Sequence, residues 1–133
     1  MKAFVAYRNT GQDRAQLQNL LSDVVGALGV RGVTAYCTFF VEPNYQRQGA
    51  REIMDHAFSV IRNSDLLFVL QTSEVKSEGM LMEVGYCLHA EIPIIVATEV
   101  GVENTYLPEM ASVAFKWADT EDLCQKIKEF QFP

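Results

Sequence analysis

Short runs of apolar residues alternate along the chain with segments in which apolar side chains recur at helical spacing. The short runs are rich in β-branched and aromatic residues, so they predict strands, at 3–7, 33–41, 66–70, 92–97 and 112–116. The periodic segments predict helices, at 13–28, 50–62, 78–90 and 120–130, with a short turn at 106–110. Strands and helices therefore alternate along nearly the whole chain.

This alternation predicts an α/β fold with a parallel sheet. The connections are long enough for right-handed crossovers, and the run at 66–70 is continuously apolar, as expected of a central strand covered on both faces. We expect a flavodoxin-like, doubly wound sheet of five parallel strands in the order 2-1-3-4-5. With 133 residues and no linker or repeat, the chain forms one domain, 1–133.

The composition narrows the class of partner. The chain is 49% hydrophobic and 21% charged, and its formal net charge is −6. Nucleic acids and anionic membranes would require a basic surface, so we expect neither as a partner, whereas one small phosphorylated ligand needs only a few local donors. No apolar run has the length of a signal peptide or of a membrane span, and we expect a cytoplasmic protein.

Metal and cofactor motifs are missing from the sequence. The three cysteines are far apart and form no Cys-x-x-Cys pair, and the two histidines have no evident third ligand. No Walker loop and no G-x-G-x-x-G occurs. We therefore expect no metal and no cofactor.

The predicted topology locates the ligand site before any motif is considered. In open α/β sheets, ligands bind at the carboxyl ends of the strands, near the point where the strand order reverses. Here that point lies between the first and third strands. The segments that follow the strands at this edge are 7–11, 39–44, 71–79 and 97–104.

The predicted helix at 78–90 carries a carboxylate at the border of its apolar face. Its apolar stripe consists of Met80, Leu81, Val84, Cys87 and Leu88. At about 100° per residue, Glu83 lies about 100° from the centre of this stripe, closer than a solvated glutamate normally does. Helical side chains lean toward the N-terminus, so Glu83 points toward the space beside Gly79. A ligand that approaches closely would explain a glycine there, which costs roughly 0.5–1 kcal/mol relative to alanine.

Ser77 is the expected N-cap of the same helix. Its hydroxyl and the free N–H groups of the first turn would form a site for an anion. The alternative interpretation of this segment is a capped amphipathic helix with one carboxylate at its border.

Two segments of the chain resemble a known enzyme family. The segment SEGMLMEVGYCLHA at 77–90, followed by IPIIV at 92–96, resembles nucleoside 2-deoxyribosyltransferases and the related deoxynucleotide N-hydrolases. Those proteins have a serine, a glycine-containing spacer, Glu-Leu-Gly and then a Gly-Lys-Pro-Val strand. The resemblance implies that Ser77 contacts a phosphate or sugar and that Glu83 is the glycosyl-accepting nucleophile. The segment FVAYRNTGQDR at 4–14 is similar to the first loop of the hydrolases, where Arg8 corresponds to a substrate-binding arginine.

The implied activity is cleavage of an N-glycosidic bond, or 2-deoxyribosyl transfer, on a nucleoside or nucleoside 5′-monophosphate. A carboxylate beneath the sugar stabilises or attacks the oxocarbenium-like centre at C1′. The leaving base also needs a proton, so a second acid is expected. The family implies Asp55 for this role, although it is displaced by about two residues; Asp65, Glu42 and Glu74 are alternatives. Tyr7 either points into the pocket from the end of the first strand or packs in the core.

A second family fits nearly as well. TIR domains begin with a similar strand and end their signature with Ser-x-Trp-Cys-x-x-Glu, and Ser77 and Glu83 keep that spacing, with Gly79 and Met80 in place of Trp-Cys. This resemblance implies an NAD glycohydrolase, or a non-catalytic module for nucleotide sensing or interaction. Because apolar side chains such as Phe39, Phe40 and Tyr106 follow the strands at the ligand edge, we also expect a homo-oligomer that closes the pocket.

Overall fold

The chain folds around a five-stranded parallel sheet. In this computed structural model, residues 1–41 and 48–133 are described, so Glu42 and most of the segment between the predicted strand at 33–41 and the predicted helix at 50–62 lie outside the described residues. The strands are β1 (Lys2–Ala6), β2 (Thr34–Tyr36), β3 (Leu66–Gln71), β4 (Ile94–Glu99) and β5 (Val113–Trp117). Their order is β2-β1-β3-β4-β5 and all four pairings are parallel, which confirms the predicted fold class.

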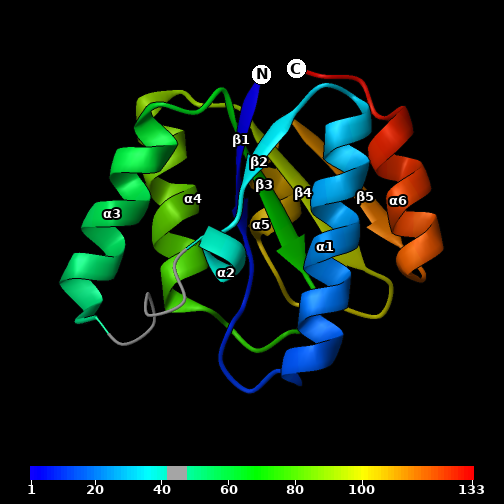
Figure 1. The fold of residues 1–133 in the computed structure, drawn as a ribbon, viewed down its shortest axis with the longest axis horizontal. Coiled ribbons are helices and arrows are strands. Elements are labelled where there is room, and N and C mark those ends of the chain that lie inside the picture. The colour runs from blue at the N-terminus through cyan, green and yellow to red at the C-terminus, as the bar shows by residue number, and fades with distance from the viewer. Residues whose placement is uncertain (42–47) are drawn as a thin grey trace.

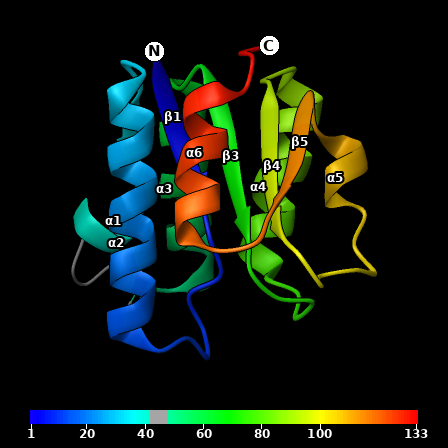
Figure 2. The ribbon, with the colours of Figure 1, turned by 90° about the vertical axis from the view of Figure 1, so that its right-hand side faces the viewer.

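Helices cover both faces of the sheet, so the domain has three layers (Figure 1). α1 (Arg14–Val30) and α6 (Thr120–Glu129) pack on one face, and α3 (Ala50–Arg62), α4 (Glu78–Ala90) and the short α5 (Leu107–Met110) pack on the other. Seen from the side, α1 and α6 lie in front of the sheet and α3 and α4 behind it (Figure 2). Within the described ranges, no helix combines the length and apolar character needed to cross a membrane.

The central strand explains why the sheet is buried on both faces. All six residues of β3 are buried, and their side chains alternate between two cores. Phe68 contributes to the core beneath α1 and α6, whereas Leu67 and Val69 contribute to the core beneath α3 and α4. A strand with apolar side chains on both faces is stable only between two helical layers.

The second predicted strand is much shorter than expected. The sequence predicted a strand at 33–41, but β2 ends at Tyr36 and α2 (Thr38–Val41) follows. β2 is an edge strand that pairs only with residues 2–4 of β1. The chain turns at Cys37, whose carbonyl accepts from the Phe40 N–H at 3.1 Å. The turn returns Thr38 and Phe39 to the end of β1, where Phe39 packs edge-on against Tyr7.

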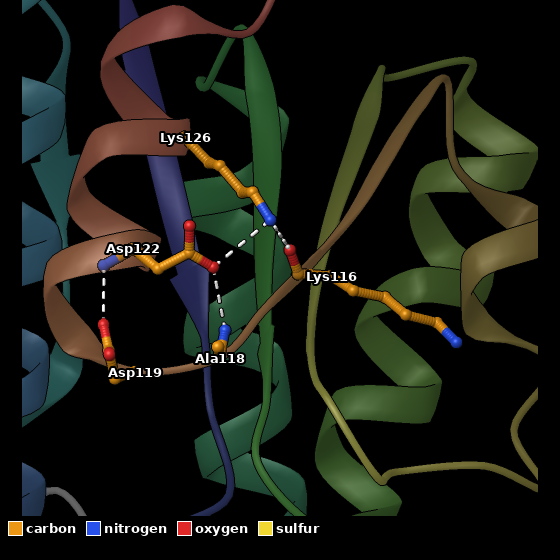
Figure 3. Close-up of polar contacts among 5 residues, drawn as sticks. All are labelled: Lys116, Ala118, Asp119, Asp122 and Lys126. Atoms are coloured by element: carbon orange, nitrogen blue, oxygen red, sulfur yellow. Dashed lines mark hydrogen bonds and ion pairs between the residues drawn. The ribbon is translucent and has the colours of Figure 1, made fainter.

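The last helix is anchored to β5 by a capping network (Figure 3). Asp119 is the N-cap, and its Oδ1 accepts from the Asp122 N–H at 2.8 Å. Asp122 in turn accepts from the Ala118 N–H at 2.8 Å and pairs with Lys126 at 3.2 Å. The Lys126 ammonium also donates to the Lys116 carbonyl of β5 at 2.6 Å. The bond from Asp122 to Asp119 satisfies an N–H group that the start of a helix leaves free, and the other bonds connect the helix to the end of β5.

Candidate functional site

Two adjoining cavities open at the carboxyl edge of the sheet. The larger, about 470 Å³, lies between the ends of β1 and β3, where the strand order reverses, and its lining includes Glu83; we call it the Glu83 cavity. The smaller, about 370 Å³, lies between the end of β3 and the segment 104–107 that follows β4, and we call it the β3–β4 cavity. The two cavities share five lining residues, Arg8, Val75, Lys76, Ser77 and Met80. Both volumes are in the range of small-molecule sites.

Glu83 is a half-buried carboxyl group in the wall of the larger cavity. It has no hydrogen bond or ion pair to any residue that the structure describes. Burial raises its pKa from 4.5 to about 8, because water that would stabilise the charged form is excluded. An ionisable group with a perturbed pKa in a cavity is a typical feature of a functional site.

The structure places Glu83 deeper than the sequence pattern indicated. Leu81 and Leu88, which the sequence assigned to the apolar stripe, are 43% and 48% exposed. The buried residues of α4 are Met80, Val84 and Cys87. At about 100° per residue, Glu83 therefore lies about 70° from the middle of the buried face, and the sequence pattern had indicated about 100°.

The start of α4 forms part of the same wall. Ser77 is the N-cap, as predicted, and its Oγ accepts from the Met80 N–H at 3.3 Å. Gly79 also lines the cavity. A Cβ at Gly79 would lie 3.6 Å from the Met54 sulfur, which is an ordinary contact, so packing within the protein does not itself require glycine there.

Arg8 lies at the border between the two cavities, together with Ser77. Its Nη1 donates to the Thr10 carbonyl at 2.7 Å, and this bond fixes the guanidinium within its own loop. The tight turn after it uses Gly11 at φ +75°. The structure thus brings the predicted residues Tyr7, Arg8, Ser77, Gly79 and Glu83 together around one cavity.

Tyr7 contributes a hydroxyl group to the Glu83 cavity. Its Oη lies 3.1 Å from Oγ1 of Thr38, which is 6% exposed. Burial raises the pKa of Tyr7 to about 12, the Thr38 bond lowers it, and the charge of Glu83 is among the effects that raise it. Tyr7 therefore keeps its proton at neutral pH. The sequence missed Thr38 because it assigned residue 38 to a strand.

The predicted second acid is not brought beside Glu83. The side chain of Asp55 is 59% exposed, pairs with Arg51 at 2.9 Å and does not line the Glu83 cavity. Its neighbours Ile53 and Met54 line the cavity instead, because α3 turns residue 55 toward solvent.

The other acid candidates have structural partners or are not described. Asp65 accepts from the Lys2 N–H at 2.7 Å, at the amino end of β1, so it closes the turn before β3. Glu74 accepts from the Glu103 N–H at 3.0 Å. Glu42 lies outside the described residues. One further carboxyl group lines the cavity, that of Glu78 in the first turn of α4, and its side chain is exposed.

The structure adds one cation that the sequence analysis did not single out. Lys76 directly precedes the N-cap and lines both cavities. Its Nζ donates to the Asn104 carbonyl at 2.7 Å, which connects the loops after β3 and β4. The sequence analysis could have found Lys76 from its position, because it directly precedes the helix start that was predicted to bind an anion. In the described part of the chain, no three potential metal ligands cluster.

Similar proteins were found by comparison of structures and not by comparison of sequences. No protein-family model matches the chain, and no curated protein matches it significantly. Similar solved structures include a CMP N-glycosidase from Clostridium botulinum, with TM-score 0.72, 15% identity and coverage of 96% of this chain and 97% of that one. A 2-deoxyribosyltransferase from Bacillus psychrosaccharolyticus also has TM-score 0.72 and 15% identity, with 99% and 93% covered.

A third similar structure is a conserved protein from Enterococcus faecalis V583, with TM-score 0.65, 15% identity and 96% of both chains covered. Alignment over nearly the full length of each chain means that the sheet and its helices correspond as a whole. At such low identity the likeness establishes the fold, and the activity has to be argued from the site. The chain therefore has the fold of the nucleoside 2-deoxyribosyltransferase-like proteins.

Proposed function

We propose that the protein is an enzyme that cleaves the N-glycosidic bond of a nucleoside or nucleoside 5′-monophosphate, or transfers its 2-deoxyribosyl group, with Glu83 as the nucleophile. One observation carries this proposal. Glu83 is a half-buried carboxyl group that lines a cavity at the strand-order reversal and has no partner among the described residues. An unpartnered carboxyl group in such a place is costly for folding, so a role toward a ligand accounts for it.

In the proposed reaction, an oxygen of the Glu83 carboxylate forms a bond to C1′. The C1′–N bond breaks, and its electron pair leaves on the base, which takes up a proton. Water then attacks C1′, the bond to Glu83 breaks to restore the carboxylate, and the second proton of the water is released. In a transfer reaction, a second base takes the place of the water.

The remaining residues of the cavity would bind and orient the substrate. The first turn of α4 presents free N–H groups at Ser77, and Arg8 lies at the same border, so a 5′-phosphate would be bound there. Tyr7 keeps its proton because its pKa is about 12, so its hydroxyl would donate a hydrogen bond to the sugar or the base. Gly79 leaves the backbone of α4 accessible to the sugar.

The test is release of free base from deoxynucleoside monophosphates, free nucleosides and NAD, followed by chromatography. Glu83→Gln keeps the volume but removes the charge that meets the cationic centre, so base release should slow by about 10²-fold or more. Glu52→Gln is the matched control, because Glu52 is exposed on α3 and lines neither cavity.

The outcomes separate the proposed functions. Base release that is equally fast in Glu83→Gln would show that Glu83 is not the nucleophile. Activity on NAD alone would favour the TIR-like glycohydrolase, whose signature spacing Ser77 and Glu83 share. A wild-type protein that is inert toward all three substrates would favour the non-catalytic nucleotide-binding module.

We also propose that the protein forms a homo-oligomer that covers part of this edge. Tyr106 is 81% exposed and Phe40 is 45% exposed, and both follow the ends of strands at the ligand edge. Burying large apolar side chains of this kind stabilises an interface. Light scattering of the purified protein should give a mass above that of one chain, and Tyr106→Ser should reduce association.

A further inference from the structure

Thr38 has a buried hydroxyl group in the wall of the Glu83 cavity, and the reaction proposed above gives it no role. The residue is 6% exposed and is one of three buried polar residues in the described part of the chain. The other two bond to each other near the ends of β3 and β4, where Thr98 donates to Gln71 at 3.2 Å. Within the described ranges, the Thr38 hydroxyl bonds only to Oη of Tyr7, at 3.1 Å. Any role of this hydroxyl at the site therefore acts through Tyr7.

The turn that carries Thr38 also holds the ring of Tyr7 in place. Phe39 packs edge-on against Tyr7, with the ring centroids 6.4 Å apart. The Arg14 guanidinium lies 4.3 Å from the centroid of the Phe39 ring and donates to Oδ1 of Asn9 at 2.7 Å. Aromatic and cation–π contacts of this kind favour particular ring geometries. The position of Oη of Tyr7 is thus set, and the direction of its O–H bond is the freedom that remains.

The bond between the two hydroxyl groups can run in either direction. A hydroxyl group has one hydrogen to donate and two lone pairs that accept. If Tyr7 donates to Thr38, its oxygen offers only a lone pair to a ligand. If Thr38 donates to Tyr7, the hydrogen of Tyr7 is free to bond to a ligand in the cavity. The direction of this one bond therefore decides whether Tyr7 is a donor or an acceptor toward the ligand.

The charge of Glu83 favours donation from Thr38 to Tyr7. Both Tyr7 and Glu83 line the cavity. Burial is the main cause of the raised pKa of Tyr7, and the negative charge of Glu83 raises it further, so this charge acts on the Tyr7 hydroxyl. A hydroxyl dipole turns its hydrogen toward a negative charge, which here directs the Tyr7 hydrogen into the cavity. The Thr38 bond lowers the pKa of Tyr7, as a bond donated to its oxygen does.

We propose that Thr38 is a positioning residue, which donates its hydroxyl hydrogen to Oη of Tyr7 and so directs the Tyr7 hydrogen to the ligand in the Glu83 cavity. This inference rests on the proposed function, because the ligand that receives the bond is the nucleoside or nucleotide of that proposal. Without the Thr38 hydroxyl, the ring of Tyr7 would keep its place, but its O–H bond would no longer be held in one direction.

The experiment is a double-mutant cycle between positions 38 and 7 in the full-length protein. Thr38→Val replaces the hydroxyl with a methyl group and should lower kcat/KM for base release about 10-fold, the effect of one hydrogen bond. Thr38→Ser keeps the hydroxyl and should retain kcat/KM within about threefold of the wild type. In the Tyr7→Phe background no hydroxyl is left to direct, so Thr38→Val should change kcat/KM by less than about twofold.

Thr98→Val is the matched control. Thr98 is also a buried threonine whose hydroxyl bonds to a side chain, but it lines neither cavity. This variant should keep base release within about twofold of the wild type. If Thr38→Val does not fold, Thr38→Ala provides the same comparison.

Three results would overturn the role of Thr38. The first is full activity without its hydroxyl group. The second is an equal loss of activity in the wild-type and Tyr7→Phe backgrounds, because the hydroxyl would then act without Tyr7. The third is a loss in Thr38→Ser as large as in Thr38→Val, because the methyl group and not the hydroxyl would then matter.

The two proposals fail in different ways. Base release that depends on Glu83, with additive effects at positions 38 and 7, would retain the proposed reaction and refute the role of Thr38. If the wild-type protein releases no base, the same cycle is measured as binding of deoxyadenosine 5′-monophosphate by calorimetry. A loss of about 10-fold that requires Tyr7 would then retain the role of Thr38 and refute the enzyme. A protein that neither releases base nor binds this nucleotide would overturn both.

Discussion

Replacing Glu83 by glutamine should stabilise the folded protein at neutral pH, although it removes the proposed nucleophile. The pKa of Glu83 is about 8 in the folded chain and about 4.5 when the group is solvated. Between these values the folded state binds a proton that the unfolded state has released. The free energy of unfolding therefore falls as pH rises from about 4.5 to about 8, the reverse of the usual behaviour of a paired carboxylate.

The size of this loss in the free energy of unfolding follows from the difference between the two pKa values. Each pH unit between them costs about 1.36 kcal/mol, so the loss is about 3 kcal/mol at pH 7 and at most about 5 kcal/mol above pH 8. Access of water to the cavity reduces both figures. Glutamine is neutral at every pH and resembles the protonated carboxyl group. Glu83→Gln should thus match the wild type near pH 4 and exceed it by up to about 3 kcal/mol at pH 7.

Urea unfolding at several pH values between 4 and 8 measures this difference. With a slope of about 2 kcal/mol per molar urea for a small domain, 3 kcal/mol moves the midpoint by about 1.5 M. Other titrating groups are common to both proteins and cancel in the comparison. Glu52→Gln, at an exposed site, should stay within about 0.5 kcal/mol of the wild type at every pH. A difference between Glu83→Gln and the wild type that does not grow with pH would refute the burial of an unpartnered carboxyl group.

Three further predictions follow from the same structure. The kcat/KM for base release should rise with pH up to about 8, because the free enzyme reacts only with Glu83 ionised; a pH–rate profile that is flat from 5 to 8 would contradict this. Asp55→Asn should keep base release within about twofold of the wild type, because Asp55 pairs with Arg51 at the surface; a loss of about 10²-fold, measured in the same assay, would instead give it a catalytic role. Asp119→Ala leaves the Asp122 N–H without its acceptor and should lower the free energy of unfolding by about 1 kcal/mol in urea titration, whereas an unchanged midpoint would mean that this cap bond does not stabilise the fold.

Local patterns were sufficient for most of the fold. The continuous apolar run at 66–70 predicted a strand buried on both faces, and β3 is the centre of the sheet. Hydrophobic periodicity predicts the wrong element where contacts with segments distant in the sequence decide which residues are buried. The apolar residues at 37–41 resemble a strand in isolation, but they form a turn and a short helix because Thr38 and Phe39 contact Tyr7.

The candidate site was predictable only in part. Ser77 and Glu83 were found because a helix cap and a carboxylate at the border of an apolar face leave local signals. Asp55 was assigned through the family resemblance alone. The helical spacing places it on the side of α3 opposite the buried residues Met54, Ala57 and Ile61, which agrees with its exposure of 59%. Thr38 gave no signal, since a threonine within an apolar run is typical of a strand.

The sequence by itself determined that five short apolar strands alternate with helices, and therefore that polar residues after the strands gather at one edge. It also determined that Glu83 lies next to the apolar face of a helix that begins at Ser77. Only the tertiary structure decided which of these residues meet. Tyr7 and Thr38 are 31 positions apart, and Gln71 and Thr105 are 34 apart, yet each pair is joined by a hydrogen bond. Hydrophobic periodicity reports the face on which a residue lies within its own element, whereas partners, burial and pKa depend on the elements that pack against it.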